Sequence, residues 1–210
     1  MNHSKVLKII QVLEKEYKTP VIFLEFSNPL ETLVATILSA QCTDARVNIV
    51  TKDLFRKYRT VRDYAKADIK EFERDIHSTG FYHNKAKNII NAAKMIISDF
   101  GGKVPDTMDG LLHLPGVARK TANIVLSHGF GKIDGIAVDT HVSRLSQRIG
   151  LSENKDPDKI ERDLMLSIPK EHWYKINYIL IMHGRKICNA RKPKCEECVI
   201  RELCPRIGVK

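Results

Sequence analysis

Residues 114–122 read LPGVARKTA, and this short stretch decides how the surrounding chain folds. Pro115 and Gly116 are residues that close a tight turn, and apolar residues resume at helical spacing directly after them. We therefore predict a helix, a turn and a second helix that begins at about Val117 or Ala118. Backbone N–H groups at such a turn can bind a phosphate oxygen without any side chain, so Gly116, Val117 and Ala118 are candidate phosphate contacts. An ordinary corner between two helices has the same pattern and remains an alternative.

The second helix carries a basic residue of interest, Lys120, in its first turn. It falls opposite a stripe of small and apolar residues that we predict to face inward: Ala118, Ala122, Val125, Leu126 and Gly129. A lysine with a neutral amine can attack a sugar or carbonyl carbon. Most lysines near a helix start are only solvated, so Lys120 alone does not establish an activity.

A carboxylate follows Lys120 after 19 residues, in the segment IAVDTHV (136–142). Asp139 precedes a helical pattern, and the usual role of an aspartate there is to cap the helix. The intervening helix and loop could also return it beside Lys120. A carboxylate in that place could stabilise positive charge on a sugar, as in the cleavage of a glycosidic bond.

Four of the five cysteines lie close together near the C-terminus, with the spacing C-x6-C-x2-C-x5-C: Cys188, Cys195, Cys198 and Cys204. Disulfides are rare in intracellular proteins, and four thiolates suit either tetrahedral zinc or an iron–sulfur cluster. Zinc sites usually use two short cysteine pairs, whereas only one is present here, which favours the cluster but leaves zinc open. Cys42 stands apart and is expected to be a small buried apolar residue.

Basic residues gather in the same region as the cysteines. Residues 184–210 carry eight Lys or Arg and three Glu, so half of the net charge of +10 lies in the last 27 residues. The loop NARKPK (189–194) holds Arg191, Lys192 and Lys194 between two cysteines. Metal ligands at both ends would order this loop, so we expect it to contact phosphates, with a merely solvated loop as the alternative.

Most of the remaining chain is patterned as helices. Apolar residues recur at helical spacing in the segments 6–13, 32–39, 47–55, 89–100, 121–130, 142–149 and 173–182. Helix starts are expected at Asn28, at Asp106 or Thr107, at Asp139 or Thr140, and at Asp156. The runs 21–26 and 136–138 could be strands but are too few for a sheet, so we predict an all-α fold.

Length and composition agree with a folded protein, since the chain has 210 residues of which 43% are apolar and 29% charged. It contains no run of 18 apolar residues and no signal-peptide pattern at its start, so we expect a soluble cytoplasmic protein without a membrane partner. The positive charge predicts an anionic partner, with nucleic acid ahead of a membrane surface.

The motifs in their order resemble one family. LPGVARKTA with Lys120, VDTH with Asp139 and the cysteine spacing resemble the endonuclease III family, which consists of helix-hairpin-helix DNA glycosylases with abasic-site lyase activity. LSAQCTDARVN (38–48) and GFYHNKA (80–86) also resemble segments of this family, so the resemblance covers nearly the whole chain.

The resemblance implies a two-lobed all-α helix-hairpin-helix DNA glycosylase fold. A six-helix domain would span 21–133, and a discontinuous domain formed by 1–20 and 134–210 would carry a 4Fe–4S cluster on the four cysteines, which decides against zinc. Double-stranded DNA with damaged pyrimidines or abasic sites would bind between the lobes. We expect a monomer associated with the nucleoid.

The resemblance also implies roles for single residues. Lys120 matches the Schiff-base lysine of the family and Asp139 its catalytic aspartate, so Lys120 would displace an oxidised or saturated pyrimidine and cut the strand by β-elimination. Gln41 and Phe81 fall where family members insert side chains into the gap left by a flipped nucleotide. The chain departs from the family at Phe81, where Leu is common, and at Ala118, where Gly is common.

Three other functions share some of these features. A monofunctional mismatch-specific glycosylase has the same fold and cluster but usually carries Tyr or Ser at the position of Lys120. A non-catalytic hairpin module that only binds DNA would need no lysine–aspartate pair. An electron carrier would have another cysteine spacing and no need of a basic loop. The bifunctional lyase therefore fits the motifs best.

Overall fold

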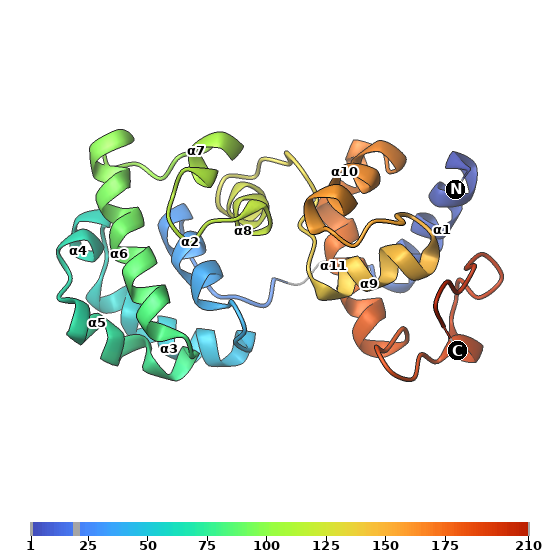
Figure 1. The fold of residues 1–210 in the computed structure, drawn as a ribbon, viewed down its shortest axis with the longest axis horizontal. Helices are drawn as coiled ribbons and strands as arrows, with labels where there is room; N and C mark the ends of the chain where they lie inside the picture. The colour runs from blue at the N-terminus through green and yellow to red at the C-terminus, as the bar shows by residue number, and fades with distance from the viewer. Residues whose placement is uncertain (1, 19–21, 210) are drawn as a thin grey trace. The chain divides into compact units, whose positions relative to one another are not determined.

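The computed structural model describes residues 2–18 and 22–209, and within them helices are the only regular secondary structure (Figure 1). The all-α prediction is confirmed for this part of the chain. The run 136–138 and residues 22–26 are irregular connections rather than strands. Val21, which begins the run 21–26, and the predicted domain boundary at 20–21 lie outside the described residues.

The chain divides into two compact units. One unit consists of Ile22–Asp134, and the other combines the described residues of Met1–Val21 and Gly135–Lys210. The second unit is therefore built from both ends of the chain.

The unit Ile22–Asp134 is a bundle of short helices around one buried helix. Its elements are α2 (Pro29–Leu38), α3 (Asp44–Lys57), α4 (Val61–Lys66), α5 (Ile69–Ile76), the 3₁₀ turn η1 (His77–Thr79), α6 (Tyr82–Asp99), α7 (Met108–Leu112), α8 (Arg119–Ile124) and the π-helical turn η2 (Val125–Gly129). Every residue of α2 from Thr32 to Leu38 is buried, so α2 is the central helix. It packs against α8 and η2 on one side and against α3 and α6 elsewhere.

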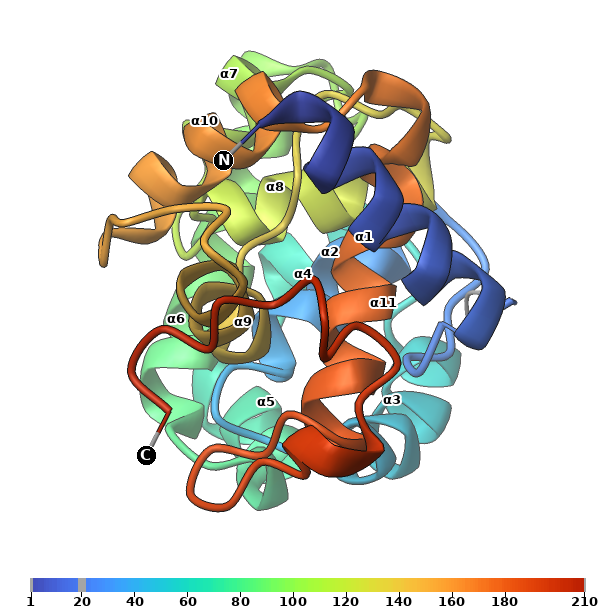
Figure 2. The same cartoon turned by 90° about the vertical axis from the view of Figure 1, so that its right-hand side faces the viewer.

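The second unit packs its N-terminal helix against its last long helix. Its elements are α1 (His3–Glu16), α9 (Thr140–Ile149), α10 (Pro157–Ser167), the 3₁₀ turn η3 (Lys170–His172), α11 (Trp173–Lys186) and the 3₁₀ turn η4 (Cys195–Glu197). Apolar residues of α1 at helical spacing, such as Val6, Ile9, Ile10 and Leu13, are buried in this unit's core. Figure 2 shows α1 alongside α11 and the chain after α11 folding past the end of that helix.

Local sequence signals placed most of the helices correctly. The side chains of Asn28, Thr107, Asp139 and Asp156 cap α2, α7, α9 and α10, as predicted. The start of the hairpin's second helix is later than predicted, at Arg119. The inward stripe is wrong at Ala118, which is exposed at the N-cap, and Asn123 is buried in the same helix instead.

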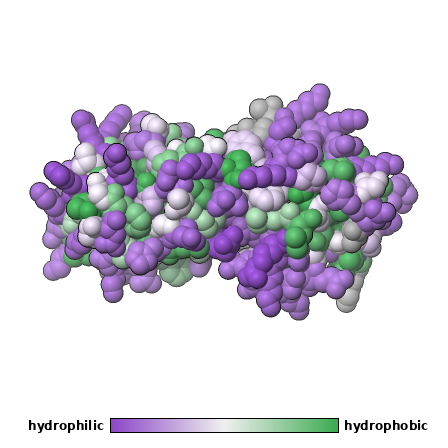
Figure 3. All heavy atoms as spheres, turned by 90° about the horizontal axis from the view of Figure 1, so that it is seen from above, coloured by the Kyte–Doolittle hydropathy of each residue, from purple (hydrophilic) through white to green (hydrophobic). Residues whose placement is uncertain are grey.

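The outer surface is polar over most of the face seen in Figure 3, where hydrophobic side chains show only as small separate patches. Within residues 2–18 and 22–209, no helix has the length and apolar content that crossing a bilayer requires.

Candidate functional site

The hairpin between α7 and α8 turns at Gly116, whose φ of +78° lies in the left-handed region that favours glycine. A Cβ at this position would also meet the Asn88 side chain at 2.8 Å, so glycine is required on both counts. The Val117 N–H donates to the Leu114 carbonyl at 3.2 Å and closes the turn. Of the three predicted phosphate contacts, Gly116 and Ala118 are exposed, whereas Val117 is buried with its N–H used inside the turn.

Lys120 lies in the first turn of α8 with an exposed side chain, whereas Ala122 and Asn123 of the same helix are buried. The N-cap residue, Ala118, has no side chain that can accept a hydrogen bond from the helix start. In the same unit α2, α3, α4, α5 and α7 all have Asn, Asp or Thr caps that accept such a bond. No cap side chain therefore binds the backbone donors at the start of α8, which lies beside an accessible amine.

Gln41 and Phe81 share an uncommon backbone conformation. Their φ angles are +53° and +49°, and Arg206 is the one other non-glycine residue with positive φ in the described chain. Each such residue costs of the order of 1 kcal/mol or more, and strain of this kind gathers at functional sites. Both side chains are exposed, and Phe81 leaves 63% of its surface in water. An apolar ring held outward by a strained backbone is suited to insertion between bases.

Asp139 caps α9, and its Oδ1 accepts the Val142 N–H at 2.8 Å. This bond orients the carboxylate, and the residue is partly buried. Lys120 belongs to the unit Ile22–Asp134, and Asp139 belongs to the unit built from both ends of the chain.

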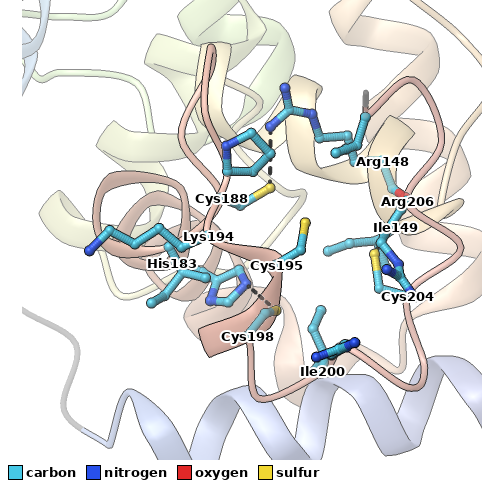
Figure 4. A pocket seen from close by; sticks show the side chains of 14 residues that line it. Arg148, Ile149, His183, Cys188, Lys194, Cys195, Cys198, Ile200, Cys204 and Arg206 are labelled. Atoms are coloured by element: carbon cyan, nitrogen blue, oxygen red, sulfur yellow. Dashed lines mark hydrogen bonds between the residues drawn. The ribbon is translucent and has the colours of Figure 1, made fainter.

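The four C-terminal cysteines line one cavity beside the end of α11, and Figure 4 shows their sulfurs around a common space. Arg148 of α9, His183 of α11 and Ile200 also line this cavity. Among the described residues, no three His, Cys, Asp or Glu side chains are arranged to hold one metal ion. Tetrahedral zinc needs four sulfurs about 2.3 Å from one ion. Four thiolates around one space are the donor set that a cluster with several irons uses.

Burial raises the pKa of the Cys198 and Cys204 thiols, with the neighbouring cysteines adding to the effect. Without a positively charged partner these two thiols therefore favour their protonated form. A metal cluster is the kind of partner that keeps buried thiolates deprotonated.

A buried histidine connects one of these cysteines to α1. The Tyr17 hydroxyl lies 3.0 Å from Nδ1 of His183, and Nε2 of His183 lies 3.4 Å from Sγ of Cys198. Burial lowers the pKa of His183 to about 4, so the neutral ring carries one N–H. When Tyr17 donates to Nδ1, this N–H sits on Nε2 and points at the sulfur.

Two arginines of α9 bind the backbone where the basic loop begins. Arg144 donates to the Cys188 carbonyl at 3.1 Å, and Arg148 donates to the Asn189 carbonyl at 2.7 Å. Nη1 of Arg148 also lies 3.4 Å from Sγ of Cys188. The helix that Asp139 caps therefore also holds the first cysteine of the cavity in place.

The cations of the basic loop are all exposed. Lys194 is paired with Glu197 at 3.6 Å, so part of its charge is neutralised locally. Arg191 and Lys192 are exposed on the loop between two cysteines of the cavity, and their contact with phosphates stays a prediction.

Comparison with known proteins places both units in one family. Residues 34–170 match the model of the HhH-GPD superfamily base excision DNA repair proteins, and residues 188–204 match the iron–sulfur binding domain of endonuclease III. The endonuclease III of Synechocystis sp. is 52% identical over 202 residues, which cover 96% of this chain and 92% of that protein. The endonuclease III of Bacillus subtilis is 52% identical over 182 residues, which cover 86% of this chain and 83% of that protein.

A solved structure of a trapped covalent intermediate of an endonuclease III with DNA is 43% identical to this chain. The two chains superpose with a TM-score of 0.92, and the match covers 98% of this chain and 97% of the chain in that structure. The fold, the cysteine cavity and the matched segments lead to one conclusion: this chain belongs to the endonuclease III family of base-excision repair enzymes, which are DNA glycosylases with abasic-site lyase activity and carry a 4Fe–4S cluster.

Proposed function

We propose that this glycosylase removes oxidised or saturated pyrimidines from double-stranded DNA and cleaves abasic sites by β-elimination, with Lys120 as the nucleophile. The observation that carries the proposal is the exposed amine of Lys120 at the uncapped start of α8, directly after the Gly116 turn. A primary amine is the group that forms an imine with the sugar of an abasic site. The relative that was trapped as a covalent intermediate with DNA supports such a step in this chain.

The reaction proceeds through a covalent bond between Lys120 and the sugar. The neutral amine attacks the anomeric carbon, the bond from this carbon to the base breaks, and the base leaves with the electron pair and takes up a proton. Opening of the sugar ring then gives an imine, which acidifies the proton on the neighbouring carbon. Loss of this proton expels the 3′ oxygen, so the strand is cut on the 3′ side of the lesion.

Asp139 assists this reaction as a carboxylate. Positive charge develops at the anomeric carbon while the base leaves, and an oriented carboxylate stabilises it. The same group accepts the proton that Lys120 loses on attack. The Val142 N–H donates to Oδ1 and so holds the carboxylate in its orientation.

DNA binding divides between contacts to phosphates and insertion into the base stack. The backbone N–H groups of Gly116 and Ala118 bind phosphates of one stretch of the DNA backbone, and Val117 shapes the turn. Arg191 and Lys192, with Lys194 beside them, bind another. Gln41 and Phe81 fill the gap left when the damaged nucleotide is turned out of the helix, which costs a few kcal/mol in lost stacking and pairing.

In this proposal the thiolates of Cys188, Cys195, Cys198 and Cys204 would hold the 4Fe–4S cluster. The bound cluster supplies an anchor that ties the basic loop to α9 and α11, and the chemistry of base removal stays with Lys120 and Asp139. The enzyme acts as a monomer in the cytoplasm, at the nucleoid where its substrate lies.

The substrate class is tested with three labelled duplexes that carry a saturated pyrimidine, an abasic site or a T·G mismatch. Base release and strand cleavage are measured separately for each. We expect both events on the saturated pyrimidine, cleavage on the abasic site, and neither on the mismatch. Release of thymine from the mismatch without cleavage would instead indicate a monofunctional glycosylase.

A further inference from the structure

Lys85 is a buried cation that the reaction does not use. It lies in the first turn of α6, only 5% of its surface is exposed, and burial lowers its pKa. Its Nζ donates to two backbone carbonyls, those of Leu38 and Thr79, each at 2.8 Å. Burying an ammonium group costs several kcal/mol unless it is well paired. The two bonds that Lys85 makes are therefore expected to serve a purpose that outweighs this cost.

Both carbonyls belong to the last residue of a helical segment. Leu38 ends α2 and Thr79 ends η1. Carbonyls at a helix end lack an intrahelical donor and carry partial negative charge, which makes them suitable partners for a cation. Lys85 therefore caps two segments that are 41 residues apart in the sequence.

Each capped segment leads directly into a residue with strained backbone. Gln41 follows Leu38 by three residues, and Phe81 follows Thr79 by two. The backbone N–H of Lys85 also donates to the Phe81 carbonyl at 3.2 Å. Through its side chain and its backbone amide, Lys85 thus fixes the chain before and after Phe81 and just before Gln41.

We propose that Lys85 is a positioning residue that fixes Gln41 and Phe81 relative to each other, so that both side chains enter the DNA as one prearranged pair. The inference rests on the proposed function, in which these two residues fill the gap in the base stack. Prearrangement matters because ordering two loops at the moment of binding would cost affinity, and a displacement of 1 Å can cost roughly 100-fold in rate.

The test uses a duplex with a stable abasic-site analogue opposite 2-aminopurine, whose fluorescence rises when inserted side chains unstack it. Wild-type protein, Lys85→Met and Lys85→Arg are compared at saturating concentration, which is established by DNA anisotropy. Ile96→Val is the matched control, because it removes one methyl group from a buried residue of the same helix.

We expect Lys85→Met to bind the duplex with most of the fluorescence rise lost, and Lys85→Arg and Ile96→Val to keep it. A full rise in saturated Lys85→Met would overturn the inference, since a merely stabilising lysine leaves insertion unchanged once the complex has formed. If the wild type itself gives no rise, the proposed insertion of Gln41 and Phe81 fails and the role of Lys85 fails with it, whereas a full rise in Lys85→Met overturns the role of Lys85 alone.

A second measurement does not depend on the folding of Lys85→Met. Gln41→Ala, Phe81→Ala and the double variant are compared in the same assay. Two side chains that act as one pair give a double variant hardly worse than either single variant. Independent, additive losses would contradict the inference.

Discussion

Arg148 of α9 donates to the carbonyl oxygen of Asn189 at 2.7 Å, and this bond joins the helix that begins at Asp139 to the first residue of the basic loop. A second bond, also 2.7 Å long, runs from Nη2 of the same guanidinium to the Ala190 carbonyl. The predicted catalytic carboxylate and the predicted phosphate-binding loop are therefore held by one helix.

Arg148→Lys should loosen the basic loop. A lysine has one ammonium on a flexible stem and cannot reproduce the planar pair of donors that reaches both carbonyls. We expect a lower iron content after purification and weaker DNA binding, measured by metal analysis and by anisotropy. Arg162→Lys, an exposed arginine of α10, is the control and should change neither. Full iron content and wild-type affinity in Arg148→Lys would show that these bonds are dispensable.

Tyr17→Phe should change the cluster without touching its ligands. The Tyr17 hydroxyl fixes the tautomer of His183 that points an N–H at Cys198. N–H bonds to ligand sulfurs help to set the reduction potential of a cluster, and they favour the more negatively charged reduced state. We expect a lower reduction potential by voltammetry. Tyr174→Phe, on the exposed part of α11, is the control and should leave the potential unchanged. An equal shift of the potential in both variants would contradict the role of His183.

Arg191 and Lys192 should account for part of the salt dependence of DNA binding. Each phosphate contact that is lost reduces the slope of log affinity against log salt by about 0.9. Arg191→Ala and Lys192→Ala are each expected to lower the slope by about this amount, measured by titration at several salt concentrations. Lys57→Ala is the control, because Lys57 is already paired with Asp75 at 2.6 Å. Unchanged slopes in both loop variants would show that the loop is merely solvated and contacts no phosphate.

Asp163 should make the protein sensitive to acid. Hydrogen bonds from Ser152 and Asn154 lower the pKa of this carboxyl below its ordinary value. Because the pKa of Asp163 is lower in the folded than in the unfolded protein, its carboxylate stabilises the fold above the unfolded-state pKa of about 4. This stabilisation is lost as the pH falls through the folded-state pKa. We expect Asp163→Asn to lower the Tm at neutral pH and to flatten the fall of Tm between about pH 5 and pH 3.

Glu153→Gln is the control for this measurement, because Glu153 is exposed. Parallel acid profiles of Asp163→Asn and the wild type would assign the acid sensitivity to other groups.

Local signals in the sequence were sufficient for most of the fold. Caps such as Asn28 and Asp156 depend on neighbours within three residues, so they can be predicted without tertiary information. The helices α4 and α5 were missed because six and eight residues are too few to show a helical period clearly. Ala118 was misplaced because a helix start allows a shift of one or two residues.

The supporting residues of the site could not be predicted in this way. Lys85 and His183 act through partners 47 and 166 residues distant, namely Leu38 and Tyr17. Nothing near them in the sequence marks them as buried. Arg148 offers a weak signal, because Arg144 precedes it by one helical turn on the same face of α9, but the carbonyls that it binds follow only from the fold.

The central claim is that Lys120 forms the covalent bond with DNA, and borohydride reduction in the presence of an abasic-site duplex tests it most directly. Digestion and mass spectrometry of the adduct should place the sugar remnant on the peptide that contains Lys120, and Lys120→Gln should bind the duplex without forming an adduct. An adduct on another residue, or undiminished trapping by Lys120→Gln, would contradict the account.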